Sequence, residues 1–233
     1  MRKLTALFLA LALSLCLASA LADRTVTVTG SGETLVTADT AVVSLGVNVR
    51  MPDALQAQSG ANEAVARIRA ALTGAGFSEE DISTGYINLY AIYNYSEDVE
   101  VIAAYNASST LAVKVTDMAR VGEVIDLAFG AGANTLDGVS FSVSDDAAAR
   151  AESLKAAVAD AKEKAAVLAE AAGLGELEIE EIREGSVISF DSGANNFALS
   201  KVAGTEEAMD AATVVRAAKI CVSAAVTVTF KVK

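Results

Sequence analysis

A strand that leads directly into a long helix, over residues 135–173, constrains the fold of this chain more strongly than any other stretch. Residues 139–144 alternate between apolar side chains and serines, the period-2 pattern of a half-buried strand. Asp145 and Asp146 then offer capping carboxylates at the start of a helix, and Gly173 is suited to end it in a left-handed conformation. We interpret this segment as a scaffold and not as a catalytic element. The predicted helix carries one apolar stripe, made of Leu154, Val158, Ala161, Ala165, Leu168 and Ala172.

Outside this segment, apolar alternation predicts further strands, and apolar residues at helical spacing predict two further helices. One helix is expected to have Pro52 at its first position, and the other to follow a capping Asp117. Gly30 and Gly32 predict a turn between the first two strands. The predicted strands cover residues 25–29, 41–50, 82–95, 101–116, 177–190 and 220–232.

The order of these elements indicates the fold class. Strand, helix and strand follow one another at 40–95 and again at 108–144, which indicates two crossover units on one sheet. The last strand, 220–232, alternates most regularly and is expected to be central. We therefore predict an α+β fold: a mixed, largely antiparallel sheet with strand–helix–strand crossover units and one long helix packed on it. On that helix, Asp160 and Lys164 are expected to pair across four residues.

The balance of apolar and charged residues excludes several classes of protein. The chain has 233 residues, of which 53% are hydrophobic and 21% charged, so it has ample material for a core and is not disordered. Its formal net charge is −12, whereas nucleic acids and anionic membranes are bound by basic surfaces. We therefore expect no nucleic-acid partner.

The first 22 residues have the organisation of a signal peptide. Two basic residues precede the apolar stretch 4–17, and small residues suited to cleavage follow at 18–22. A retained anchor and a lipid on Cys16 are the alternatives, although the apolar stretch is short for a bilayer span. We predict an extracytoplasmic protein, periplasmic or secreted, with a single domain over 23–233 and no membrane-spanning helix after cleavage.

The chain lacks the side chains of common catalytic and metal sites. It has no histidine, and signal cleavage would leave one cysteine, which excludes histidine-based triads and cysteine-rich zinc sites within one chain. Acidic clusters lie at 79–81, 97–100 and 178–181, but none has the spacing of a calcium loop, and solvated surface is the simpler interpretation. We predict no enzyme activity, no metal and no cofactor. A carboxylate-based hydrolase is the remaining enzymatic alternative, because its two acids can be distant in sequence.

The tyrosines form one candidate site. All five lie between residues 86 and 105, on one predicted hairpin. Tyr86 and Tyr90 share one face of a strand and are candidates for a ligand or interface surface, with cross-strand packing as the alternative. Packing is the expected role of the remaining three, Tyr93, Tyr95 and Tyr105.

The single cysteine of the cleaved chain is the second candidate. Cys221 falls on the polar face of the predicted last strand. It is either accessible, as a redox-sensitive thiol or an intermolecular disulfide, or covered by a helix. The segment 191–219 before it, rich in small and polar residues, is expected to be a long irregular loop.

Several short motifs, each weak alone, form a specific set through their order and spacing. They are Val28-Thr29-Gly30-Ser31-Gly32-Glu33, Ala38-Asp39-Thr40-Ala41, Leu89-Tyr90 with Tyr93 and Tyr95, Gly132-Ala133-Asn134 before Gly138-Val139, and Ala159-Asp160-Ala161 with Lys164-Ala165. This set, over residues 25–185 and the last strand, resembles the SIMPL-domain family of bacterial exported proteins. Ala38, Ala91 and Ala104 depart from the proline or glycine usual in that family. The resemblance implies an exported α+β domain that is prone to oligomerise, with some relatives linked to stress tolerance or acting as surface antigens. It implies no reaction.

Two hypotheses for function follow. The first is a non-enzymatic cell-envelope protein that acts through self-assembly, as a homo-oligomer, or through contacts with other envelope proteins. The alternative is a small-ligand binding module that uses the Tyr86 and Tyr90 surface.

Overall fold

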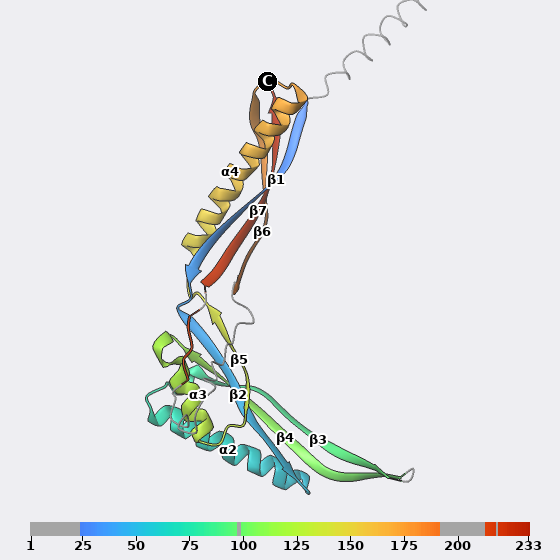
Figure 1. The fold of residues 1–233 in the computed structure, drawn as a ribbon, viewed down its shortest axis with the longest axis vertical. Helices are drawn as coiled ribbons and strands as arrows, with labels where there is room; N and C mark the ends of the chain where they lie inside the picture. The colour runs from blue at the N-terminus through green and yellow to red at the C-terminus, as the bar shows by residue number, and fades with distance from the viewer. Residues whose placement is uncertain (1–23, 97–98, 192–212, 218) are drawn as a thin grey trace, which may run out of the picture. The chain divides into compact units, whose positions relative to one another are not determined.

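The computed structural model describes residues 24–96, 99–191, 213–217 and 219–233, which form an α+β fold as predicted (Figure 1). Contacts gather in two compact units, and each is described separately below. One contains residues up to 34, with 147–188 and 222–233; the other contains 35–146 and 189–221. The predicted signal peptide, Cys16 and most of the predicted loop 191–219 lie outside the described residues. No helix within the described ranges is long and apolar enough to cross a membrane.

The first unit is a three-stranded sheet with one helix packed on it. The strands are β1 (Thr25–Thr37), β6 (Leu177–Asp191) and β7 (Lys219–Val232), in the order β1-β7-β6, and the helix is α4 (Ala147–Ala172). The last strand is therefore central in its sheet, as its alternation predicts. Its inward residues Val226, Val228 and Phe230 are buried against α4.

The buried face of α4 differs from the predicted stripe. It consists of the small residues Ala149, Ser153, Ala157, Ala161, Ala165 and Ala169, whereas Leu168 is half exposed. The reason lies in β1, where Gly30 and Gly32 belong to a continuous strand and not to the predicted turn. A Cβ atom at Gly30 would lie 2.8 Å from Ala161 Cβ and closer still to the carbonyl oxygen of Ala157. Strand and helix backbones approach so closely that only small side chains fit between them.

A charged cluster fixes the register of α4 on β1. The predicted pair between Asp160 and Lys164 is present, with 2.7 Å between Oδ2 and Nζ. The backbone N–H of Ser31 donates to the same Asp160 oxygen at 2.7 Å, and Lys164 Nζ donates to the carbonyl oxygen of Thr29 at 3.2 Å. Two hydrogen bonds lower the pKa of Asp160: the one from Lys164 has the larger effect, and the one from the backbone N–H of Ser31 follows.

The substitution Asp160→Asn is expected to remove the part of the folding stability that depends on the ionised Asp160 carboxylate. In the original chain this part is lost in acid. A carboxylate whose pKa is lowered by folding stabilises the folded state above its ordinary pKa of 3.8, and this contribution is lost as the pH falls through the lowered value. In urea unfolding, the original chain should therefore exceed the variant in stability at neutral pH, and the difference should shrink toward about pH 3 and below. A difference that is the same at both pH values would contradict this account.

The second unit has a four-stranded sheet in the order β3-β4-β2-β5. The strands are β2 (Thr40–Met51), β3 (Ile82–Ser96), β4 (Val99–Val115) and β5 (Thr135–Ser142). All pairings in this sheet are antiparallel, so β2 and β3, which flank β4, run parallel, as do β4 and β5, which flank β2. The chain joins each parallel pair through a helix, which confirms the two predicted crossover units on one sheet.

The helices of this unit cover one face of its sheet. They are α2 (Ala54–Gly74) and α3 (Val121–Gly130), with short 3-10 turns η1 (Glu79–Asp81) and η2 (Met118–Arg120). The predicted start of α2 at Pro52 is wrong, because Asp53 caps it by accepting from the N–H groups of Leu55 and Gln56. Asp117 accepts from the N–H of Ala119 and so caps the turn before α3. The largest buried core residues are Val43, Leu45, Val47, Ile68, Leu72, Leu111, Val113, Val121 and Val124.

Candidate functional site

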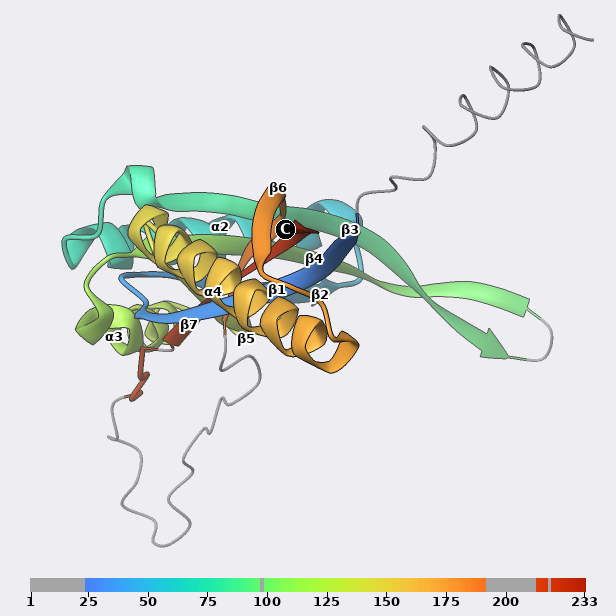
Figure 2. The ribbon, with the colours of Figure 1, turned by 90° about the horizontal axis from the view of Figure 1, so that it is seen from above.

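The hairpin formed by β3 and β4 carries the largest group of exposed apolar residues in the second unit. Among the described residues, β3 is an edge strand that pairs with β4 alone. β2 reaches only as far as the pair of Met51 with Tyr105, so residues 99–104 of β4 pair with β3 alone. Figure 2 shows these two strands continuing together as a twisted ribbon toward their turn.

The strand register assigns the hairpin residues to two faces. Directly paired residues point to the same side of a sheet, and Ala107 and Leu111 of β4 belong to the core beneath the helices. Leu89 pairs with Ala107 and therefore lies on this helix-bearing face. Ile87, two residues away on the same strand, shares it.

Tyr93 continues the alternation of Leu89 along β3 and lies on the helix-bearing face as well. A register shift after Ile92 pairs it with Ile102, which brings Ile102 to the same face. Because α2 packs mainly on β2 and β4, the outer part of this face is left uncovered. Four apolar side chains are exposed there; we call them the apolar stripe. They are Ile87 at 60%, Leu89 at 41%, Tyr93 at 44% and Ile102 at 44% exposure.

Tyr90 lies on the opposite face, and both it and Tyr86 are about half exposed. Tyr86 falls within the register shift between Thr84 and Ile87, so its shared face with Tyr90 stays a prediction. Tyr90 pairs with Asn106, whose Nδ2 donates to Tyr90 Oη at 3.1 Å and to Asn48 Oδ1 at 2.6 Å. The role of Tyr86 and Tyr90 as ligand or interface residues stays a prediction.

The other tyrosines and the cysteine have different environments. Tyr105 is partly buried against the core, in its predicted packing role. Tyr93 is directly opposite Ile102, which agrees with the cross-strand packing predicted for it, and its ring is exposed in the apolar stripe. The side chain of Tyr95 is outside the described set. Cys221 is 5% exposed on the central strand β7, so the accessible-thiol alternative is wrong and burial is confirmed.

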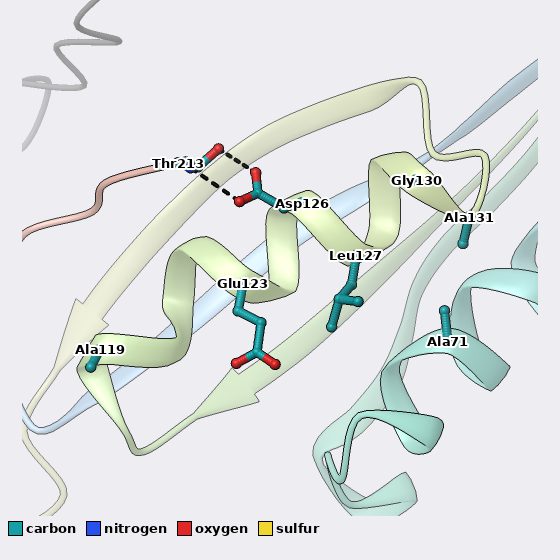
Figure 3. Close-up of a pocket in the computed structure, with 8 residues that line it drawn as sticks. All are labelled: Ala71, Ala119, Glu123, Asp126, Leu127, Gly130, Ala131 and Thr213. Carbon is teal, nitrogen blue, oxygen red and sulfur yellow. Dashed lines mark hydrogen bonds between the residues drawn. The ribbon is translucent and has the colours of Figure 1, made fainter. Parts of the chain in front are cut away.

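Sequence reasoning missed a groove beside α3 (Figure 3). It has a volume of about 700 Å³, with Ala71 of α2 on one side and, on the other, Leu127 of α3 and Ala131 just after this helix. Asp126 holds the segment that begins at Thr213, accepting from its N–H at 3.0 Å and its hydroxyl at 2.6 Å. The hint of this contact in the sequence is the glycine at position 122. A larger residue would not fit, because a Cβ atom there would overlap the carbonyl oxygen of Thr213.

The acids of this groove are engaged in the protein's own contacts. Arg120 donates to Glu123 at 2.8 Å, which lowers the pKa of Glu123, and its guanidinium lies 4.0 Å from the centre of the Phe77 ring. Asp126 is bonded to Thr213, so both carboxylates of the groove have partners within the protein.

The acidic clusters singled out in the sequence do not converge. Glu79 pairs with Arg69, and Glu181 with Arg183. Residues 97 and 98 lie outside the described ranges. No group of three or more potential metal-ligating side chains occurs in the part of the chain that the structure describes.

The fold and the hairpin define an α+β protein whose most distinctive surface is an edge strand with an apolar side. Comparison with known proteins agrees with the motifs in the sequence. The SIMPL family, described as a protein of unknown function (DUF541), matches residues 26–230, and the chain belongs to this family.

Curated relatives include two from Brucella and one from Escherichia coli. The 26 kDa periplasmic immunogenic protein is 34% identical over 164 residues in B. melitensis and 33% identical in B. abortus; the match covers 68% of this chain and 66% of each relative. The uncharacterized protein YggE of E. coli K12 is 29% identical over 144 residues, covering 62% of this chain and 58% of YggE. The matches therefore span just under two thirds of the Brucella proteins and 58% of YggE. The protein is extracytoplasmic, as predicted.

Proposed function

We propose that this SIMPL-family protein acts without catalysis, by self-assembly at the cell envelope, and that the apolar stripe of the β3–β4 hairpin forms the contact between copies. The observation that carries this proposal is the exposure of Ile87, Leu89, Tyr93 and Ile102 together on one side of an edge hairpin. Contiguous apolar surface of this kind is typical of protein interaction sites.

The position of the stripe supports a contact that extends the sheet. The outer edge of β3 has backbone N–H and C=O groups that no strand of its sheet pairs with. A strand added at this edge would gain main-chain hydrogen bonds and would cover the stripe on the same side.

The chemistry of the stripe favours a second copy as the occupant. All four side chains lack charge, so two copies can bring the stripe together although each chain carries a net charge of −12. An edge strand that pairs with its own copy about a two-fold axis makes a self-complementary contact, the commonest arrangement in soluble oligomers.

A paired charge substitution tests the stripe. In the chain lacking the predicted signal peptide, Ile87→Asp with Leu89→Asp would bury two unpaired carboxylates in the contact, so the mass measured by light scattering should fall to that of the monomer. The matched control is Val167→Asp with Leu168→Asp, because these α4 residues are 61% and 50% exposed and lie outside the hairpin. The control should keep the mass of the original chain. Equal masses for both variants would contradict the proposal.

A further inference from the structure

The face of the four-stranded sheet opposite the helices carries a regular array of polar side chains. The register gives two rows across β3, β4 and β2, and we call these six residues the polar grid. The first row is Asn88, Ser108 and Asn48, and the second is Tyr90, Asn106 and Arg50. All except Asn106 and Ser108 are well exposed.

Asn106 organises the grid from its centre. Its side chain is more than nine-tenths buried, and both hydrogens of its amide are used, one toward Asn48 Oδ1 and one toward Tyr90 Oη. These bonds fix the orientation of the two neighbours. They turn the amino group of Asn48 away from Asn106, and they leave the hydroxyl proton of Tyr90 available because its oxygen accepts.

Around Asn106 the grid leaves three kinds of donor available, on Asn48, Arg50 and Tyr90, beside the mixed donor and acceptor groups of Asn88 and Ser108. Asn48 Nδ2 donates to no group in the described residues, and Arg50 makes no ion pair or hydrogen bond there, although the chain has 30 acidic residues. The three donors are therefore the amide of Asn48, the guanidinium of Arg50 and the hydroxyl of Tyr90, whose ring is exposed beside them. Acceptor groups on a ligand would meet these three donors, and the guanidinium favours an anionic acceptor such as a carboxylate.

The distance between Tyr90 and Arg50 and the exposed ring of Tyr90 limit the kinds of ligand that fit. Tyr90 and Arg50 flank Asn106 on its two sides, so their backbones are two strand spacings, about 10 Å, apart. A sugar ring that lies against the exposed Tyr90 side chain can present its hydroxyls to Asn48 and reach the long Arg50 side chain with a carboxylate. We propose that the polar grid is a binding site for saccharides that carry a carboxylate, such as uronic acids.

The grid is separate from the apolar stripe. The two surfaces use opposite faces of β3, and they share no residue. Saccharide binding therefore goes beyond the proposed self-assembly, and each can fail without the other.

Calorimetric titration of the chain lacking the predicted signal peptide tests the site, with tetragalacturonate as the probe. Arg50→Gln should weaken binding at least about tenfold, because it removes the charge that meets the carboxylate. Tyr90→Phe should weaken it less, because the ring remains. Lys114→Gln is the matched control, since Lys114 pairs with Val42 on the same sheet face but outside the grid. This control should bind as the original chain does.

Several results would overturn the assignment: no heat of binding with the original chain, equal binding by Arg50→Gln, or equal binding of the neutral maltotetraose. Competition by inorganic phosphate at the same concentration as the probe would show an anion site without saccharide recognition, and would also overturn it. Arg50 is exposed, so its variant should keep the fold, which circular dichroism can verify. The Ile87→Asp with Leu89→Asp variant should bind tetragalacturonate unchanged, which separates this test from that of assembly.

Discussion

Replacing Gly30 by alanine is expected to destabilise the first unit by about 3 kcal/mol, at the upper end of the usual cost of overpacking. The added methyl group would overlap the carbonyl oxygen of Ala157 and lie 2.8 Å from both Cβ and N of Ala161. These are mainly backbone atoms of α4, which cannot move aside as the end of a flexible side chain can. The helix would have to shift away from β1, and the contacts of Val226 and Val228 with α4 would loosen. Chemical unfolding followed by circular dichroism measures the change.

Gly74→Ala is the control for Gly30→Ala. Gly74 is the last residue of α2, and a Cβ atom there would meet nothing within 4 Å. Alanine favours a helix more than glycine does, so this substitution should be neutral or stabilising by up to about 1 kcal/mol. If Gly30→Ala were as stable as Gly74→Ala, the close approach of β1 to α4 would be wrong.

Leu111→Ala is expected to have an effect of similar size in the second unit. Leu111 is fully buried on β4, where it pairs with Leu45 of β2 and lies beneath the helices. Truncation leaves a cavity in a closely packed core, which costs about 2–5 kcal/mol in comparable sites. We expect about 3 kcal/mol, measured as the change in the free energy of unfolding in urea.

The same truncation at an exposed leucine provides the comparison. Leu168 of α4 is 50% exposed, and Leu168→Ala should change the stability by less than about 1 kcal/mol. A loss for Leu111→Ala no larger than that for Leu168→Ala would contradict the assigned core.

Local patterns in the sequence predict the elements well. Alternation in 220–232 predicts a central strand, and β7 is the middle strand of its sheet. The crossover units follow from the order of strands and helices, because local periodicity and chain connectivity suffice to define them. The predicted face of α4 is partly right, since Ala161 and Ala165 are buried, and wrong at Leu168. A helix rich in alanine has several apolar faces, and the choice among them is made by Gly30 and Gly32, more than 100 residues earlier.

The candidate site is harder to predict from the sequence than the helices and strands are. The shared face of Tyr86 and Tyr90 can be predicted from alternation alone. The exposure of Tyr93 cannot, because it depends on the position of β3 at the edge of the sheet, beyond the cover of α2. The presence of Ile102 on the same face cannot either, because it depends on the register shift after Ile92. The apolar stripe depends on the register within one hairpin, and the polar grid also depends on the pairing of β4 with the distant strand β2. Neither pairing can be read from the sequence alone.

The most direct test of the central claim, self-assembly through the β3–β4 hairpin, is the solution mass of the chain lacking the predicted signal peptide. We would measure it by light scattering over a wide range of protein concentration, with and without reductant. The account predicts a discrete multiple of the monomer mass that reductant does not change, because Cys221 is buried. A monomer mass at every concentration would contradict it.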